Sequence, residues 1–359
     1  MAADRGRLDG KGLDGKGLSW RLGGYVVGAT ATPDGRYFAV GLGDGTVGVL
    51  DLTDAAAGFK SHTAHKGSCL SFAGDITGGA FLTGGDDGKL ISTAIDGTST
   101  TIADVGRKWI EHVDAHPATG VRVYAAGKDA FILGKKDKEA RKVSHPNTVG
   151  GVAINPKGRR VAVSHYGGVS LWWLAAKDSR ADLLPWKGSH LQVAWNPEGD
   201  YVVTAMQESA LHGWRLADAQ HFRMQGYAAK IRSLSFNRRG AFLATGGADT
   251  VICWPFTGGG PMGKAPAEFG GGLNGPPVTC VLASPKLEAV AAGFEDGRII
   301  VGQPGVPRVV TVAPPHKEKE GAAITALAWT PGSDRLLAGS EAGDVHVVDF
   351  RVMAGEMVD

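Results

Sequence analysis

One pattern returns eight times along this chain and limits its fold more than any other feature. Each copy combines a turn with proline or glycine, a short apolar strand, a turn rich in glycine or acidic residues, and a second apolar strand. The copies occupy residues 33–51, 78–96, 117–137, 156–174, 197–216, 238–256, 285–303 and 331–349, and we number them first to eighth. Aligned on Gly41, Gly84, Gly127, Ser164, Ala205, Gly246, Gly293 and Gly339, they follow at steps of 37 to 47 residues. Strand–turn–strand units at this spacing are typical of β-propeller blades.

The composition agrees with many short strands around a packed core. The chain has 55 glycines among 359 residues, placed at turns and without a Gly-x-y period. Apolar residues make up 43% and charged residues 21%, which is ample for a core. We therefore expect an all-β domain.

The net charge argues against nucleic-acid and membrane binding, and the cysteines indicate the cellular compartment. A formal charge of +2 does not indicate the strongly basic surface that would bind nucleic acid or an anionic membrane. The basic run at 134–142 carries acids among its lysines, so we expect a solvated loop there, with an anion-binding patch as the alternative. Cys69, Cys253 and Cys280 lie far apart, which favours reduced thiols and a cytoplasmic protein. No signal segment and no apolar run of membrane-spanning length is present.

The repeated unit resembles the WD40 repeat. That repeat has a strand ending in Ser-Pro-Asp-Gly, then an Ala-Ser-Gly strand, an Asp-Gly turn and a strand closing on Trp-Asp. This chain has TPDG at 32–35, NPKG at 155–158, NPEG at 196–199, GDDG at 85–88 and FEDG at 294–297. The resemblance covers about residues 18 to 350, and eight copies in register make it specific.

The copies also depart from the WD40 pattern, so we expect a divergent member. None closes on Trp-Asp, although Trp172, Trp214 and Trp254 fall in third strands. The repeat's histidine survives as His65 and His145. The resemblance implies a hydrogen-bonded His–Ser/Thr–Trp set, which His145, Ser164 and Trp172 match best.

Eight copies predict eight four-stranded blades, with seven as the alternative, because seven is the commoner number in the family. The segment 18–22 precedes the first copy, and we expect it to pair with the last copy and close the ring. We divide the chain into a flexible tail at 1–17, which contains a duplicated DGKGL, one propeller domain at 18–352 and a C-terminal tail at 353–359.

Several motifs suggest chemistry but favour structural roles. The segment GGGPMGKA at 258–265 lacks the Ser/Thr and the following helix of a phosphate loop, so we expect a flexible loop. His62 and His65, or His112 and His116, lack the further ligands of a zinc site. The turn aspartates recur once per copy, as structural residues do: Asp44, Asp87, Asp129, Asp249 and Asp296. We predict no catalytic residue, no metal and no cofactor.

Adjacent aromatic residues in the fourth copy, Trp172 and Trp173, must face opposite sides of a strand. One should pack between blades, which is the interpretation we favour for the pair.

The resemblance to WD40 proteins implies a binding surface on the narrower face, around the central channel. This face is formed by the loops that enter the first strands and by the turns between second and third strands. We expect the partner-binding residues to be Tyr25, Lys66, Trp109, Glu111, Asn147, Tyr166, Trp186, Gln192, Gln207, Tyr227, Lys230, Arg232, Asn274, Phe294 and Glu295. The long loop 314–323 should lie on the same face and 258–272 on the opposite one.

The leading functional hypothesis is a non-catalytic scaffold that binds one or more proteins or peptides and is a monomer on its own. The alternative is a propeller enzyme with a site at the channel mouth, of the hydrolase, lactonase or quinone-dependent dehydrogenase type. RNA binding would require a one-sided basic face, and the near-balanced charge argues against it.

Overall fold

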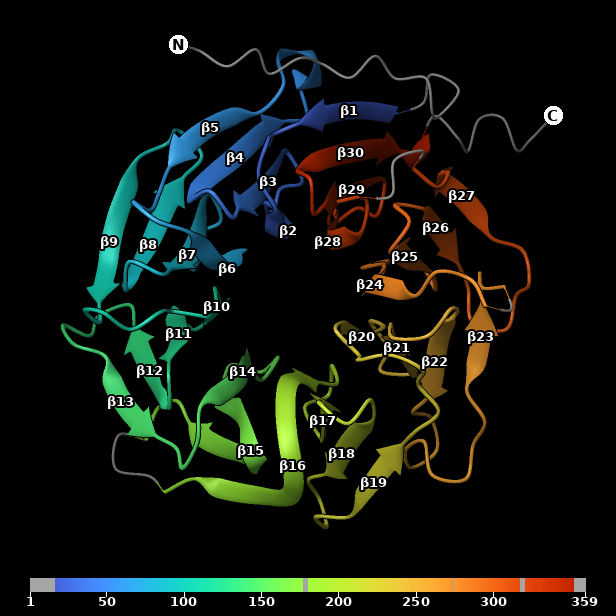
Figure 1. Cartoon of the computed structure of the whole chain (residues 1–359). Coiled ribbons are helices and arrows are strands. Elements are labelled where there is room, and N and C mark those ends of the chain that lie inside the picture. The colour runs from blue at the N-terminus through green and yellow to red at the C-terminus, as the bar shows by residue number, and fades with distance from the viewer. Residues whose placement is uncertain (1–16, 177–179, 273, 317–319, 352–359) are drawn as a thin grey trace.

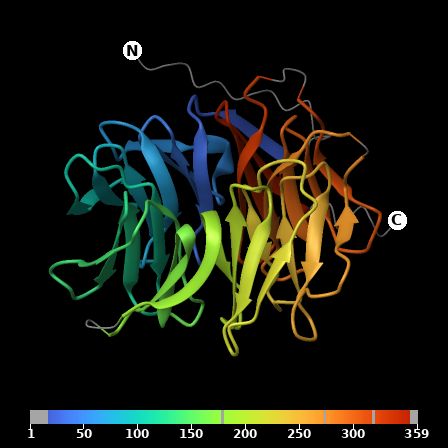
Figure 2. The same ribbon diagram turned by 60° about the horizontal axis from the view of Figure 1, so that its bottom comes forward.

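Seven sheets stand around a central axis like the sectors of a ring (Figure 1). The computed structural model describes residues 17–176, 180–272, 274–316 and 320–351. Turning the ring by 60° shows strands that run between two faces covered by loops (Figure 2). The fold is therefore an all-β propeller, as the repeats predict. Among the described residues, no helix is long and apolar enough to cross a bilayer.

Six of the sheets have four antiparallel strands each. The first three are built by β2 (Val26–Ala31), β3 (Tyr37–Leu42), β4 (Thr46–Asp51) and β5 (Lys60–Thr63); by β6 (Cys69–Gly74), β7 (Ala80–Gly85), β8 (Lys89–Ala94) and β9 (Ser99–Asp104); and by β10 (His112–His116), β11 (Val121–Ala126), β12 (Asp129–Gly134) and β13 (Arg141–Ser144). A short 3-10 helix, η1 (Ala55–Ala57), joins β4 to β5.

The other three four-stranded sheets follow in the second half of the chain. They are built by β20 (Leu234–Phe236), β21 (Phe242–Thr245), β22 (Val251–Pro255) and β23 (Ala267–Phe269); by β24 (Val278–Ala283), β25 (Val290–Phe294), β26 (Ile299–Gly302) and β27 (Val310–Ala313); and by β28 (Ile324–Trp329), β29 (Arg335–Ser340), β30 (Asp344–Asp349) and β1 (Gly17–Arg21).

The seventh sheet has six strands and holds both the fourth and the fifth copy. Its members are β14 (Val149–Ile154), β15 (Arg160–Trp173), β16 (Asp182–Trp195), β17 (Tyr201–Met206), β18 (Leu211–Arg215) and β19 (His221–Met224). The first half of β16 pairs with β15, and its second half pairs with β17. In Figure 1, β16 follows the rim and then bends toward the centre.

The sheets therefore correct the expected number of blades. Eight separate four-stranded blades is wrong, and the alternative of seven agrees with the sheets that form. All eight copies of the sequence pattern are nevertheless present, because β16 joins two of them without a break. Gly188, with φ of +133°, lies inside β16 between Pro185, which pairs with β15, and His190, which pairs with β17. β15 itself folds back at Gly167 and Gly168, which have φ of +97° and +138°. A Cβ on Gly168 would lie 2.2 Å from the carbonyl oxygen of Leu184, on β16.

The ring closes as expected, through pairing of the N-terminal strand with the last copy. β1 lies antiparallel to β30, with Gly17 opposite Val348 and Arg21 opposite Asp344. The Arg21 guanidinium also donates two hydrogen bonds to the Asp344 carboxylate, at 2.7 and 3.0 Å. Trp20 is buried in the closing core and meets Phe59 edge to face. The predicted tails at 1–17 and 353–359 otherwise lie outside the described residues.

The core consists of apolar layers between neighbouring sheets. Glycine in the second strand brings these layers close together: a Cβ on Gly41 would lie 2.7 Å from the ring of Phe72 in the next sheet. The alignment positions lie in second strands except in the third and sixth copies, where Gly127 and Gly246 directly follow β11 and β21.

The adjacent tryptophans of the fourth copy face opposite sides, as predicted. Trp172 packs against an apolar core cluster and donates a hydrogen bond from Nε1 to His145 Nε2 at 3.1 Å. Trp173 is 41% exposed, and the Arg160 guanidinium lies 4.8 Å from its ring centroid. One ring therefore belongs to the core and the other to the surface.

Candidate functional site

The loops ahead of the first strands and the turns between second and third strands share one face, which we call the entry face. Backbone hydrogen bonds connect the two sets, for example from Gly43 N to Tyr25 O at 2.8 Å and from Glu295 N to Pro277 O at 3.0 Å. His316 N likewise donates to Asp296 O, so the described part of loop 314–323 begins on this face. The loop after β22 lies at the other end of its sheet.

Most of the predicted binding residues are accessible on the entry face. The exposed members are Tyr25, Lys66, Trp109, Glu111, Asn147, Tyr166, Gln207, Arg232, Asn274 and Glu295. Trp186, Gln192 and Lys230 are partly buried. Trp109, at 57% exposed, Tyr166 at 49% and Tyr25 at 47% are among the most exposed large apolar side chains described.

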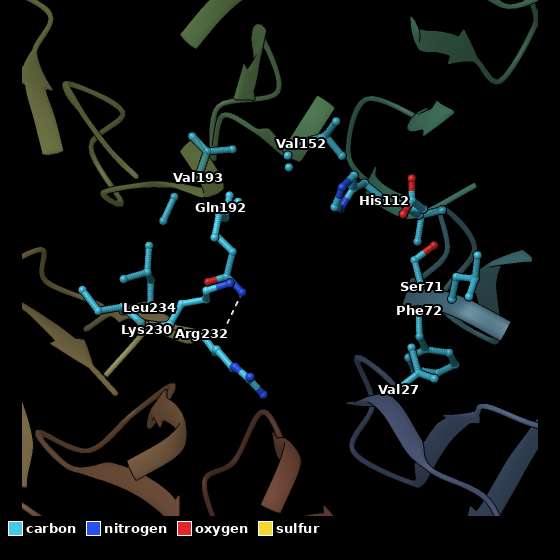
Figure 3. A pocket seen from close by; sticks show the side chains of 18 residues that line it. Val27, Ser71, Phe72, His112, Val152, Gln192, Val193, Lys230, Arg232 and Leu234 are labelled. Atoms are coloured by element: carbon cyan, nitrogen blue, oxygen red, sulfur yellow. Dashed lines mark hydrogen bonds between the residues drawn. The ribbon is translucent and has the colours of Figure 1, made fainter. Parts of the chain in front are cut away.

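A cavity of about 500 Å³ occupies the centre of the ring. First strands from several sheets line it, including β6, β10, β14 and β16, and its walls combine valine and leucine side chains with polar and charged ones. The predicted residues that meet here are Glu111, Gln192, Lys230 and Arg232. Figure 3 shows Arg232 reaching into the open middle, with His112 and Ser71 on the far wall.

Polar contacts fix the mouth of this cavity. Gln192 Nε2 donates to the backbone oxygen of Arg232 at 2.6 Å, which holds the loop ahead of β20 (Figure 3). Partial burial and then the nearby Glu341 raise the pKa of Tyr25, while Arg232 lowers it. Tyr25 and Arg232 are thus electrostatic neighbours although they lie far apart in the sequence.

An outer hollow of about 430 Å³ lies beside the central cavity, on the third copy. Arg107, Lys108, Trp109 and Lys128 line it, and Glu111 lines both this hollow and the central cavity. Lys108 Nζ donates to the Asp129 carboxylate at 2.9 Å. We call it the Trp109 hollow.

A second outer hollow of about 410 Å³ lies where the fourth and fifth copies join. Tyr166 and Trp186 line it together with Glu208 and Arg223. Behind it, Trp186 stacks on His212 with ring centroids 4.0 Å apart. The two aromatic residues predicted here therefore share one hollow.

Two predicted binding residues are wrong as accessible side chains. Tyr227 is only 8% exposed, and its hydroxyl group bonds Thr245 Oγ1 and accepts from Trp254 Nε1, both at 2.7 Å. Phe294 is fully buried at the end of β25, beneath the guanidinium of Arg298 at 3.8 Å. Tyr227 lies in an entry loop as predicted, whereas Phe294 is the last residue of β25, and both side chains turn into the core.

Tyr227 takes the hydrogen-bonding role that histidine has in the WD40 repeat. In the second copy, His65 bonds Thr83 Oγ1 through Nε2 and Asp87 through Nδ1, both at 2.9 Å. In the sixth copy, the tyrosine hydroxyl group joins a threonine and a tryptophan in the same way. In the fourth copy, the predicted inclusion of Ser164 in the set with His145 and Trp172 is wrong. Ser164 Oγ donates to the carbonyl oxygen of Gly151 and not to His145.

The motifs that suggested phosphate binding, catalysis or metal binding have structural roles in the described residues. Lys264 Nζ donates to the backbone oxygens of Thr257 and, at 2.9 Å, Gly260, so its own loop occupies it. Asp44, Asp87 and Asp296 accept hydrogen bonds from backbone N–H groups in their own turns, as expected of turn residues. Among the described residues, no three His, Cys, Asp or Glu side chains gather as a metal site would require.

The sequence argument missed two features of the site. Arg107 and Lys128 were not selected because basic residues in loops rarely signal a site until the fold brings them together. First-strand hydroxyl groups also bond from sheet to sheet around the channel: Ser71 to Ile110 O, Thr279 to Ile324 O and Thr325 to Val26 O. Hydroxyl residues recurring at the start of first strands were the available signal.

Comparison with known proteins identifies the repeat. The family model described as "WD domain, G-beta repeat" matches residues 220–254, which run from the outer strand of the fifth copy through β22. This segment contains the Tyr227–Thr245–Trp254 set. No curated protein matches the chain. The matched repeat and the ring of sheets together show that the chain is a WD40-repeat β-propeller.

Proposed function

We propose that the protein is a non-catalytic scaffold that binds a protein or peptide partner on the entry face, around the mouth of the central channel. WD40 domains generally bind protein partners, and the entry face should be the narrower one. The observation that carries the proposal is the gathering of three hollows with exposed aromatic residues on this one face. Aromatic and arginine side chains are enriched among residues that dominate binding energies.

The rigidity of the ring supports this role. First strands are held by their own sheets, and several also by side-chain bonds to the next sheet, so the face is preformed. A preformed surface loses little conformational entropy when a partner binds. We further propose a cytoplasmic location, since Cys69, Cys253 and Cys280 are free thiols, as is usual in a reducing compartment.

Affinity capture from the lysate of the source organism, followed by mass spectrometry, tests the proposal. The test variant carries Trp109→Ala, Tyr166→Ala and Arg232→Ala on the entry face. The control carries Trp173→Ala, Arg239→Ala and Leu287→Ala, which remove exposed side chains away from that face. Circular dichroism confirms that both variants remain folded.

The proposal predicts a partner that the parent and the control variant capture and the test variant loses. A partner retained by the test variant and lost by the control would place binding elsewhere on the propeller. If none of the three captures a partner, the propeller-enzyme alternative gains weight, and an absorbance scan and metal analysis of the purified protein follow.

A further inference from the structure

We infer that the partner segment bound on the entry face is an acidic linear peptide, lying from the channel mouth into the Trp109 hollow. This inference rests on the proposed function and adds the chemistry of the partner. It starts from the unequal distribution of charge, because the chain as a whole is almost neutral at +2.

Among the charged residues that line the two cavities, cations outnumber acids. Arg107 and Lys128 are exposed in the Trp109 hollow, and Lys230 and Arg232 line the central cavity. Among the described residues, none of these four forms an ion pair. A partner with carboxylates would supply the missing counter-charges, and charge complementarity of this kind also accelerates association.

Opposing acids near these cations are few. Asp129 is already paired with Lys108, whose ammonium group is 2.9 Å away. Glu341 lies close enough to Tyr25 to raise its pKa, on the side of the mouth where Arg232 lies. Glu111 alone lines both cavities. The surplus of cations therefore persists after these acids are counted.

Glu111 also shows how the cavities connect, because it forms part of both walls. An extended chain passing over it would have one end above Arg232 and the other beside Trp109. The Trp109 ring is 57% exposed and offers an apolar surface between cations. We therefore expect at least one apolar or aromatic residue among the acidic residues of the partner.

The lining favours a peptide over single-stranded RNA, the other polyanion with flat apolar groups. RNA-binding grooves combine a continuous basic track with several aromatic rings on which successive bases stack. Here the Trp109 hollow offers one exposed aromatic ring. Phe72 and His112 also line the central cavity, but the Phe72 ring packs against the neighbouring sheet, and Val27, Val113, Val152 and Leu234 form the aliphatic part of the wall. Aliphatic walls suit amino-acid side chains better than bases.

Selection from a phage-displayed library of random peptides against the full chain tests the inference. The hollow variant combines Arg107→Ala, Trp109→Ala and Lys128→Ala. Its matched control combines Lys135→Ala and Lys136→Ala, exposed between β12 and β13, with Trp173→Ala. We expect enriched peptides to be rich in Asp and Glu, with an apolar residue. Their affinity should fall about tenfold or more in the hollow variant and remain unchanged in the control. Higher salt should weaken binding.

Each other outcome overturns the inference in a different way. Neutral or basic peptides that bind the parent and lose affinity in the hollow variant would leave the scaffold role intact but remove the acidic specificity. Acidic peptides that bind all three proteins equally would show that the site is wrong. Oligouridine binding that depends on the hollow, without enriched acidic peptides, would indicate a nucleic-acid surface. If no peptide is enriched and lysate capture also fails, the scaffold proposal fails with it.

Discussion

Histidine side chains occupy contrasting environments in this ring. His65 is buried, but both of its ring nitrogens have partners. His212 is completely buried and stacked against Trp186, and neither of its ring nitrogens has a hydrogen-bond partner among the described residues. Burial, with His221 and His190 nearby, lowers the pKa of His212 to about 3. His212 is thus neutral in the fold, and its two buried nitrogens without partners lower the stability.

Replacing this side chain should stabilise the fold. His212→Phe keeps a ring against Trp186 and removes two unsatisfied buried nitrogens, which we expect to raise the free energy of unfolding by about 1–3 kcal/mol at neutral pH. Urea denaturation measures the change. The exposed His221→Gln is the control and should change stability less. An equal or lower stability of His212→Phe would contradict this account.

The same residue should make the parent sensitive to acid. The pKa of His212 is lowered on folding, so the unfolded chain binds more protons between about pH 6.5 and 3. Its contribution to stability is present above pH 6.5 and is lost as pH falls. The parent should lose up to ~1.4 kcal/mol per pH unit more than His212→Phe in this range.

At the scale of elements, two strands connect parts that the repeat alone would leave separate. β1 joins the start of the chain to the eighth copy, and β16 joins the fourth copy to the fifth. The closing sheet depends on Trp20, whose indole ring is only 8% exposed and meets Phe59 at 5.3 Å.

Loss of the Trp20 side chain should weaken closure of the whole ring. Trp20→Ala leaves a cavity between the first and last sheets and should lower the free energy of unfolding by about 3–5 kcal/mol. Trp173→Ala, which removes an exposed tryptophan, should change it by less than about 1 kcal/mol. Urea denaturation of both variants provides the comparison. Similar midpoints would show that β1 does not hold the ring closed.

The strands could be predicted from sequence because each copy repeats the same turn and strand signals. Closure followed from a spare strand ahead of the first copy. Fusion of two copies could not be predicted, since it depends on the continuous path of β16 through Gly188. For the site, register placed the loops correctly. The inward direction of the Tyr227 side chain could not be predicted, because the sequence does not show that this tyrosine takes the place of the repeat's histidine. The packing of its hydroxyl group against Thr245 shows it.

At the scale of the whole molecule, the ring presents a preformed face with a central cavity and two outer hollows. Its chemistry is uneven: unpaired cations line the mouth and the Trp109 hollow, whereas the chain is close to neutral overall. The ring is held by sheets, by sheet-to-sheet side-chain bonds and by the β1 closure. A partner can therefore bind without reorganising the fold.

Site-specific photocrosslinking in the native lysate tests the central claim most directly. A photoreactive phenylalanine analogue replaces Tyr166 on the entry face in one protein and Trp173, away from it, in another. Our account predicts a crosslinked partner band from position 166 and none from position 173. A band from position 173 alone would contradict the claim that the entry face is the binding surface.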